Sequence, residues 1–199
     1  MIDITAIGSV KPRQALTRAG AWPGDEIYVS GRIGAAAAGL EMLRRQEDSA
    51  ASVSTVVESC VQRYLCPEPR VRLGMLLSRN RAASACMDLS DGLADAVRQV
   101  AAASGLGAII DADALPIDEP TRGWFDGHGT DPVTGAIAGG DDYELLVAVR
   151  PRLRRRLAST AGCPGAPMTR IGQFTEDPAL IVRRAAGDTS LPLGYGHFR

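Results

Sequence analysis

Short runs of alternating or continuous apolar residues recur along the chain and predict β-strands, while other runs repeat their apolar residues at helical spacing. Strands are predicted at residues 2–7, 26–30, 83–87, 108–111, 144–149, 169–174 and 179–182. Helices are predicted at residues 35–45, 52–65, 70–79, 132–138 and 152–161, and a further helix begins near residue 90. The stretch 113–129 is rich in turn residues and is predicted to be a loop, with His128 exposed.

This alternation of strands and helices predicts an α/β domain, or α+β in a looser sense, in which helices pack on a mixed β-sheet. The length of 199 residues suits one domain. The strand at residues 2–7 begins almost at Met1, so no earlier element of this chain can pair with it. Because a strand needs a neighbour for its backbone hydrogen bonds, we expect its partner to come from elsewhere.

Charge and composition exclude several classes of protein. The formal net charge is −1, and the basic run Arg152–Arg156 lacks interleaved aromatic residues, so it is predicted to be a solvated helix face and not a nucleic-acid surface. No apolar run approaches the ~20 residues of a membrane helix. The four cysteines form no C-x-x-C pair and only two histidines are present, which argues against a zinc cluster and predicts free thiols. We therefore expect a cytoplasmic protein that binds neither nucleic acid nor membrane.

Carboxylates and a hydroxyl gather in the segment Ala85–Asp95, where a predicted strand runs into a predicted helix. Apolar residues between Leu93 and Val100 recur at helical spacing, so the helix begins near Ser90 or Asp91. Either residue is a common N-cap, and negative charge at this end of a helix is favoured by the helix dipole. Helix capping is therefore one interpretation of this segment.

Asp88 is not explained by capping because it lies at the end of the predicted strand. If Asp88 and Asp91 converge across the turn, a hard divalent cation with oxygen ligands would relieve their repulsion. Magnesium held by one or two carboxylates and by substrate phosphates is the expected arrangement, and Ser90 would then donate to a phosphate oxygen. The residues alone leave both interpretations open, the helix cap and the magnesium–phosphate turn.

Two glycine-rich segments are further candidates for binding. Gly31–Gly34 joins a predicted strand to a predicted helix, a place where free backbone N–H groups can meet an anion. In the second segment, Gly139–Glu144, two glycines precede three acidic residues and one tyrosine. These carboxylates either face a cationic or metal-bound ligand or are the solvated side chains of a tight turn.

Taken together, several segments resemble one family, the thiamine-monophosphate kinases, within the superfamily of aminoimidazole-ribonucleotide and selenophosphate synthetases. The resemblance covers essentially the whole chain, in order and in spacing. Its segments are residues 15–25, 28–40, Asp88–Leu93, Gly139–Leu145, Ile171–Gly172 and Gly194–Phe198. It implies the fold of the C-terminal domain of that superfamily.

The resemblance also implies roles for particular residues. In the family the Asp-x-Ser-Asp-Gly turn binds magnesium and the phosphates of ATP, which makes Asp88 and Asp91 metal ligands and Ser90 an ATP contact. The acidic residue after the glycine pair contacts the thiamine phosphate, and here that residue is Asp141, where the family usually has glutamate. An aromatic residue of the family's C-terminal tail lies near the thiamine, and Tyr195 is the candidate in this chain. No catalytic residue is assigned.

The family's N-terminal domain, which carries further magnesium ligands, an ATP segment and the dimer interface, has no counterpart in this sequence. The resemblance therefore implies that residues 1–10 are a strand left from a missing N-terminal domain and that residues 11–199 are the C-terminal, kinase-like domain. The implied reaction is ATP-dependent phosphorylation of thiamine monophosphate to thiamine diphosphate, by a truncated chain that lacks the N-terminal ATP and magnesium domain. The expected protein partner is a second copy of the chain, in a homodimer, or a separately encoded N-terminal half. The alternative is a non-catalytic domain that binds a phosphorylated ligand, or half of a split enzyme of the same superfamily.

Overall fold

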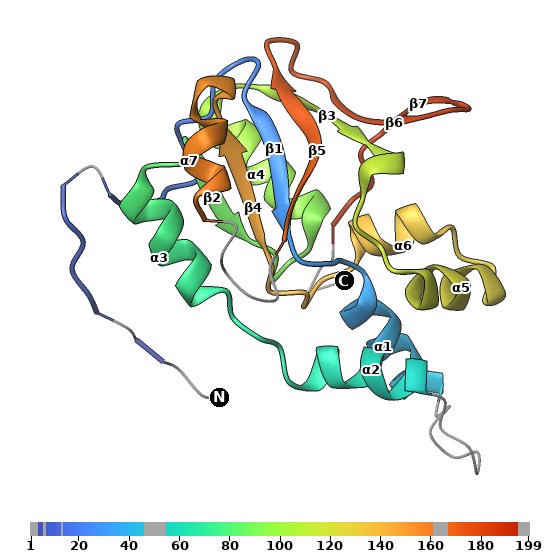
Figure 1. Ribbon diagram of the computed structural model, residues 1–199. Coiled ribbons are helices and arrows are strands. Elements are labelled where there is room, and N and C mark those ends of the chain that lie inside the picture. The colour runs from blue at the N-terminus through green and yellow to red at the C-terminus, as the bar shows by residue number, and fades with distance from the viewer. Residues whose placement is uncertain (1–3, 6, 13, 46–54, 161–166, 195–199) are drawn as a thin grey trace.

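The computed structural model describes residues 4, 5, 7–12, 14–45, 55–160 and 167–194, and the core of this described part is a seven-stranded mixed sheet (Figure 1). The strand order is β2-β4-β1-β5-β3-β6-β7, and among these pairs β3 and β6 are parallel while the others are antiparallel. The strands are β1 (Glu26–Ser30), β2 (Ala85–Asp88), β3 (Gly107–Asp111), β4 (Leu145–Val149), β5 (Met168–Thr175), β6 (Leu180–Arg184) and β7 (Gly187–Ser190).

Helices pack on this sheet and beyond one end of it, so the expected α/β fold with a mixed sheet is confirmed. They are α1 (Ala35–Arg45), α2 (Thr55–Leu65), α3 (Val71–Asn80), α4 (Leu93–Ser104), α5 (Glu119–Gly127), α6 (Pro132–Ala138) and α7 (Arg154–Ala158). Short 3-10 turns lie at Ala112–Ala114 and Pro151–Leu153.

The two faces of the sheet are both buried, as the continuous apolar sequence of β4 requires. Leu146 and Ala148 point into the core that α4 covers, while Val147 and Val149 point into the core that α3 and α7 cover. A third apolar cluster joins α1, α2 and α5, which lie together beyond one end of the sheet (Figure 1). The sheet therefore serves as a rigid platform, and the helices beyond its end border the loops that leave it.

One expectation about local structure was wrong, and a second is tested only at a few residues. Residues 113–129 were predicted to be a loop, but they contain α5, whose start is capped by Asp118: its carboxylate Oδ1 accepts from the backbone N–H of Thr121 at 2.9 Å, and Pro120 lies in the first turn. Of the predicted strand at residues 2–7, the described residues 4, 5 and 7 form no strand within this chain, and Ile4 and Ile7 are exposed. Residues 2, 3 and 6 lie outside the described residues. The proposed domain boundary at residue 10 stays a prediction.

The structure also bears on the expectations about the cysteines, about membrane-spanning helices and about the basic run Arg152–Arg156. Cys60, Cys66 and Cys86 are free thiols, as predicted, whereas Cys163 lies outside the described residues. Within the described part of the chain, no helix combines the length and the apolar character needed to cross a membrane. In the basic run, Arg154 is not merely solvated, because it forms a bidentate ion pair with the buried carboxylate of Glu26.

Candidate functional site

The two acidic motifs found in the sequence lie side by side because β2 and β4 are antiparallel neighbours. Asp88 at the end of β2 is paired with Leu145 at the start of β4, so the turn that follows β2 meets the loop that precedes β4. Backbone hydrogen bonds join them: the N–H of Asp141 donates to the carbonyl of Ser90 at 2.8 Å, and the N–H of Leu89 donates to the carbonyl of Glu144 at 2.8 Å. The topology thus builds one site from two segments about 50 residues apart.

Gly92 is the point of closest approach between the two segments. It is the N-cap residue of α4 and has φ +87°, and a Cβ added to it would lie 1.9 Å from the carbonyl oxygen of Gly139. The helix therefore begins at Leu93, and neither Ser90 nor Asp91 occupies the N-cap position that the capping interpretation gave them. That interpretation is corrected: Ser90 and Asp91 belong to the turn before the helix.

We expect Gly92→Ala to reduce the free energy of unfolding by about 2 kcal/mol more than Gly105→Ala does. Both glycines have positive φ, so alanine is strained at either position and costs about 1–2 kcal/mol for that reason alone. A Cβ at Gly105 meets nothing within 4 Å, whereas at Gly92 it must displace the Gly139 carbonyl. Equilibrium urea unfolding measures both values, and equal losses would contradict the close contact.

The loop Gly139–Glu144 turns its side chains alternately outward and inward. Asp141 and Tyr143 are partly exposed and have positive φ values of 65° and 51°, which are strained for residues with a side chain. Asp142 and Glu144 are buried, at 2% and 0% exposure. Sequence reasoning treated the three carboxylates as one group that either faces a ligand or is solvated, and the structure contradicts this for the two buried ones.

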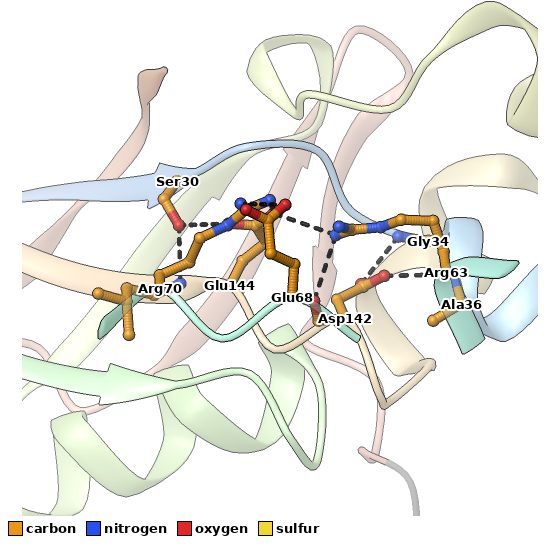
Figure 2. A network of polar contacts seen from close by, with 9 residues as sticks. Ser30, Gly34, Ala36, Arg63, Glu68, Arg70, Asp142 and Glu144 are labelled. Atoms are coloured by element: carbon orange, nitrogen blue, oxygen red, sulfur yellow. Dashed lines mark hydrogen bonds and ion pairs between the residues drawn. The ribbon is translucent and has the colours of Figure 1, made fainter. Parts of the chain in front are cut away.

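Asp142 caps α1 from within the protein. Its Oδ2 accepts from the backbone N–H of Gly34 at 2.8 Å and its Oδ1 accepts from the N–H of Ala36 at 3.4 Å (Figure 2). The turn Gly31–Gly34 was expected to offer free N–H groups to an anion, and two N–H groups at this helix start do bind one, the carboxylate of the protein's own Asp142.

Burial raises the pKa of Asp142 from its ordinary 3.8 to about 7, against the opposing effect of the two N–H donors. The unfolded chain therefore releases this proton near pH 4, while the folded chain keeps it until about pH 7. We expect the free energy of unfolding to fall as pH rises through this window. Asp142→Asn keeps the acceptor for the helix cap and removes the titration, so its stability profile should be flatter between pH 4 and 7. A profile identical to that of the parent chain would contradict the shift.

Glu144 anchors the other end of the loop through the network shown in Figure 2. Arg70 makes two hydrogen bonds to its carboxylate, at 2.8 and 2.6 Å, and Arg63 makes one at 3.1 Å. The hydroxyl of Ser30 donates to the same carboxylate at 2.6 Å and accepts from the N–H of Leu145. The Arg70 side chain is 7% exposed and Glu144 is fully buried, so each charge depends on the other for solvation.

These two anchors explain how the strained backbone persists. Asp142 fixes the loop to the start of α1, and Glu144 fixes it to Arg63 on α2 and to Arg70 just before α3. A loop held on both sides can keep Asp141 and Tyr143 in unfavourable conformations and direct them away from the core. The buried carboxylates of Asp142 and Glu144 thus position the partly exposed residues Asp141 and Tyr143.

The residues assigned from the sequence are placed as follows. Asp88 is exposed at the end of β2, and Ser90 and Asp91 are partly buried in the turn, next to Asp141. Tyr195 lies outside the described residues. Among the residues that the structure describes, no group of three or more His, Cys, Asp or Glu side chains is arranged to hold a metal ion. A magnesium ion at this turn would therefore take its remaining ligands from elsewhere, such as phosphates and water.

Arg63 and Arg70 were missed by sequence reasoning. They lie 81 and 74 residues from Glu144 in the sequence, and no local sequence pattern predicts a contact between residues so far apart along the chain. One indirect sign was present: an acidic residue directly before the apolar run Leu145–Val149 is placed for burial, and a buried carboxylate requires a cationic partner.

Comparison with known proteins gives a consistent result. The family model for AIR synthase related protein, C-terminal domain, matches residues 23–184. The thiamine-monophosphate kinase of Salmonella typhimurium is 40% identical over 194 residues, which is 96% of this chain and 58% of that protein. The chain thus spans less than two thirds of the length of this relative.

Two solved structures extend the comparison. The crystal structure of thiamine-monophosphate kinase from Stenotrophomonas maltophilia has a TM-score of 0.77 and 36% identity, over 87% of this chain and 54% of that one. The structure named "AaThiL complexed with AMPPCP and TMP" has a TM-score of 0.75 and 30% identity, over 92% of this chain and 54% of that one. At 36% and 30% identity, these two structures resemble this chain in sequence as well as in fold.

Proposed function

Because the chain belongs to the family of AIR synthase related proteins, C-terminal domain, we propose that it forms part of a kinase that phosphorylates thiamine monophosphate with ATP. The observation that carries this proposal is the direct contact between the turn Asp88–Asp91 and the loop Gly139–Glu144. A nucleotide-phosphate site and an acceptor site must adjoin for a phosphoryl group to pass between them. The names of the relatives support thiamine monophosphate and ATP as the two substrates.

In this proposal Asp88 and Asp91 hold Mg²⁺, Ser90 donates a hydrogen bond to a phosphate of ATP, and Asp141 contacts the thiamine phosphate. The donor set fits: two carboxylates in one turn, of which Asp88 is exposed, suit an ion that keeps several waters and takes phosphate oxygens as further ligands. Bound Mg²⁺ would neutralise the charge that develops on the transferred group. The protein itself would hold the turn Asp88–Asp91 and the loop Gly139–Glu144 in a fixed position relative to each other.

The proposed reaction depends more on the alignment of the two substrates than on a general base. An oxygen of the thiamine phosphate attacks the γ-phosphorus of ATP, the bond from that phosphorus to the β-phosphate oxygen breaks, and ADP leaves. A phosphate monoester has a second pKa of about 6, so the attacking oxygen is already largely anionic at neutral pH. The scarcity of histidine, with two in the whole chain, is compatible with such a reaction.

A chimera tests the proposal. This chain is joined to the part of the Salmonella relative that it does not match, and the chain by itself is assayed in parallel. With thiamine monophosphate, ATP and Mg²⁺, the chimera should form thiamine diphosphate and ADP in equal amounts. We expect the chain by itself to turn over at least about 100-fold more slowly, since part of the magnesium and nucleotide site is expected to lie in the other part.

Two results would change the conclusion. Efficient formation of thiamine diphosphate by the chain by itself would contradict the proposal that the chain holds only part of the kinase's catalytic site. Binding of thiamine monophosphate that ignores both Mg²⁺ and ATP, in a chimera without activity, would favour the non-catalytic binding domain. A dimer, a separately encoded partner and a cytoplasmic location stay predictions.

A further inference from the structure

A cavity of about 660 Å³ opens beside Glu144, between the turn that follows β1, helix α2 and the start of α5. Its volume falls within the usual range for small-molecule pockets, and none of the roles proposed above for the kinase reaction uses it. Among the described residues, its charged lining consists of the arginines Arg32, Arg63 and Arg70 and the carboxylates Glu68, Asp118 and Glu144. Because these formal charges cancel, what the cavity attracts depends on which of these groups already have partners.

The three carboxylates are already engaged. Arg70 donates to both oxygens of Glu144, and its Nη1 lies 2.9 Å from Oε2 of Glu68. Asp118 accepts from the backbone N–H of Thr121 at 2.9 Å, at the start of α5. Each nitrogen of the Arg70 guanidinium therefore faces a carboxylate, and this arginine has no donor left for a ligand.

The other two arginines keep unused donors. Arg63 uses only its Nη2 group, which donates to Oε1 of Glu144 at 3.1 Å and to the carbonyl of Asp142 at 3.3 Å. Within the described chain its Nε and Nη1 groups have no acceptor, and its side chain is 25% exposed. Arg32 is 68% exposed, and the 3.7 Å between its Nη1 and Oδ2 of Asp118 is too long for a hydrogen bond. The cavity thus offers unused cationic donors, which suit an anion rich in oxygen atoms.

Arg63 also connects this cavity to the candidate site. Its Nη2 group contacts both residues that anchor the loop Gly139–Glu144, the side chain of Glu144 and the backbone of Asp142, as Figure 2 shows. A ligand that binds the remaining N–H groups of Arg63 therefore fixes the guanidinium that holds the loop. Because the loop borders the turn Asp88–Asp91, occupancy of the cavity is linked to the candidate site.

We propose that this cavity binds a small anion of the phosphate class through Arg63 and Arg32, and that Arg63 transmits its presence to the loop Gly139–Glu144. Arginine suits this task because its planar group matches the geometry of phosphate oxygens. The hydroxyls of Thr55 and Ser59 on α2 line the same cavity and are able to donate to such an anion. The inference goes beyond the proposed function, because this binding is expected of the chain by itself, without thiamine monophosphate, ATP or Mg²⁺.

Isothermal titration calorimetry of the chain by itself with pyrophosphate tests the binding step. Mg²⁺ is left out, so that no bound cation draws pyrophosphate to the turn Asp88–Asp91. Pyrophosphate should bind in a saturable way at one site per chain, whereas uncharged glycerol should not bind. Arg32→Gln removes the exposed guanidinium and should weaken binding at least about fivefold. Arg79→Gln makes the same change on the exposed side of α3 and should leave the affinity unaltered.

Hydrogen exchange measures the link to the loop. Saturating pyrophosphate should slow exchange of the amides of Asp141 and Leu145, which are hydrogen-bonded to Ser90 and Ser30, at least about threefold. Arg63→Gln keeps an amide donor at this position but lacks the guanidinium, so this variant should neither bind pyrophosphate nor show slower exchange. Unfolding curves of the variants separate loss of binding from loss of folding.

Each outcome supports or overturns the inference. If Arg32→Gln and Arg79→Gln bind pyrophosphate equally tightly, or if glycerol binds as well as pyrophosphate, the cavity is not an anion site. Binding of pyrophosphate that leaves the exchange of Asp141 and Leu145 unchanged would overturn the link to the loop. If Arg63→Gln does not fold, Arg32→Gln decides the question of binding. None of these measurements involves phosphoryl transfer, so a negative result leaves the proposed kinase function standing, and an inactive chimera leaves this inference standing.

Discussion

Asp91→Asn and Asp88→Asn are each expected to lower the rate of thiamine diphosphate formation by the chimera at least about 100-fold. Removal of even an outer partner of a bound metal typically costs 10–100-fold in affinity or activity, and these two residues are proposed as direct ligands. Asparagine has nearly the same size as aspartate but lacks the charge that attracts Mg²⁺. The rate is measured as a function of Mg²⁺ concentration, and higher concentrations should recover part of it.

Folding provides the control for this experiment. Gly92, not Asp91, is the N-cap of α4, and Asp88 is exposed, so both substitutions should change the free energy of unfolding by less than about 1 kcal/mol. Asp113→Asn makes the same change at an exposed position of a 3-10 turn outside the site and should leave the rate unaltered. A collapse of stability in Asp91→Asn with unchanged dependence on Mg²⁺ would return this residue to a structural role.

Glu144→Gln is expected to reduce the free energy of unfolding by about 3–5 kcal/mol, as measured by equilibrium urea unfolding. The substitution keeps the shape of the side chain and removes its charge, so Arg70 is left buried without its main counter-ion and Arg63 loses its ion pair. Hydrogen bonding to Glu144 is also what raises the pKa of Arg70, which shows how far the guanidinium depends on this carboxylate.

Glu68 offers a matched control for the same arginine. It contacts Arg70 at 2.9 Å, but its side chain is 71% exposed. Glu68→Gln should therefore cost no more than about 1 kcal/mol. Adding Arg70→Met to Glu144→Gln should restore part of the stability, because it removes the buried unpaired charge. Equal losses for Glu68→Gln and Glu144→Gln would contradict the anchoring role of Glu144.

The sequence predicted the elements that rest on local pattern. β4 is a compact apolar run, and α4 carries the buried stripe Leu93, Val97 and Val100, so both were found close to their true positions. α5 was missed because the glycines around Trp124 outweighed its start signal, the capping residue Asp118 followed by Pro120. At residues 4, 5 and 7, the described part of the predicted strand 2–7, no strand is formed within this chain, since alternation does not make a strand without a neighbouring strand to pair with.

The candidate site was predicted only in part, because its contacts join segments that lie far apart in the sequence. The two acidic motifs were recognised one by one, but their contact depends on the pairing of β2 with β4, which no local pattern encodes. The inward direction of Asp142 and Glu144 is likewise fixed by Gly34, Arg63 and Arg70, which lie 108, 81 and 74 residues away in sequence. The residue types in the sequence indicated the chemistry of the site. The topology determines which carboxylates are buried and which remain accessible for that chemistry.

The position of β1 in the middle of the sheet has a consequence for how the chain folds as it is made. β1 lies between β4 and β5, and Leu145 follows Ser30 by 115 residues. A ribosome adds roughly 5–20 residues per second, so β1 waits roughly 6 to 23 seconds for its first partner strand. During that interval Ile27 and Val29, fully buried in the finished protein, have no sheet to join. The nascent chain should therefore need protection from aggregation until its last third emerges.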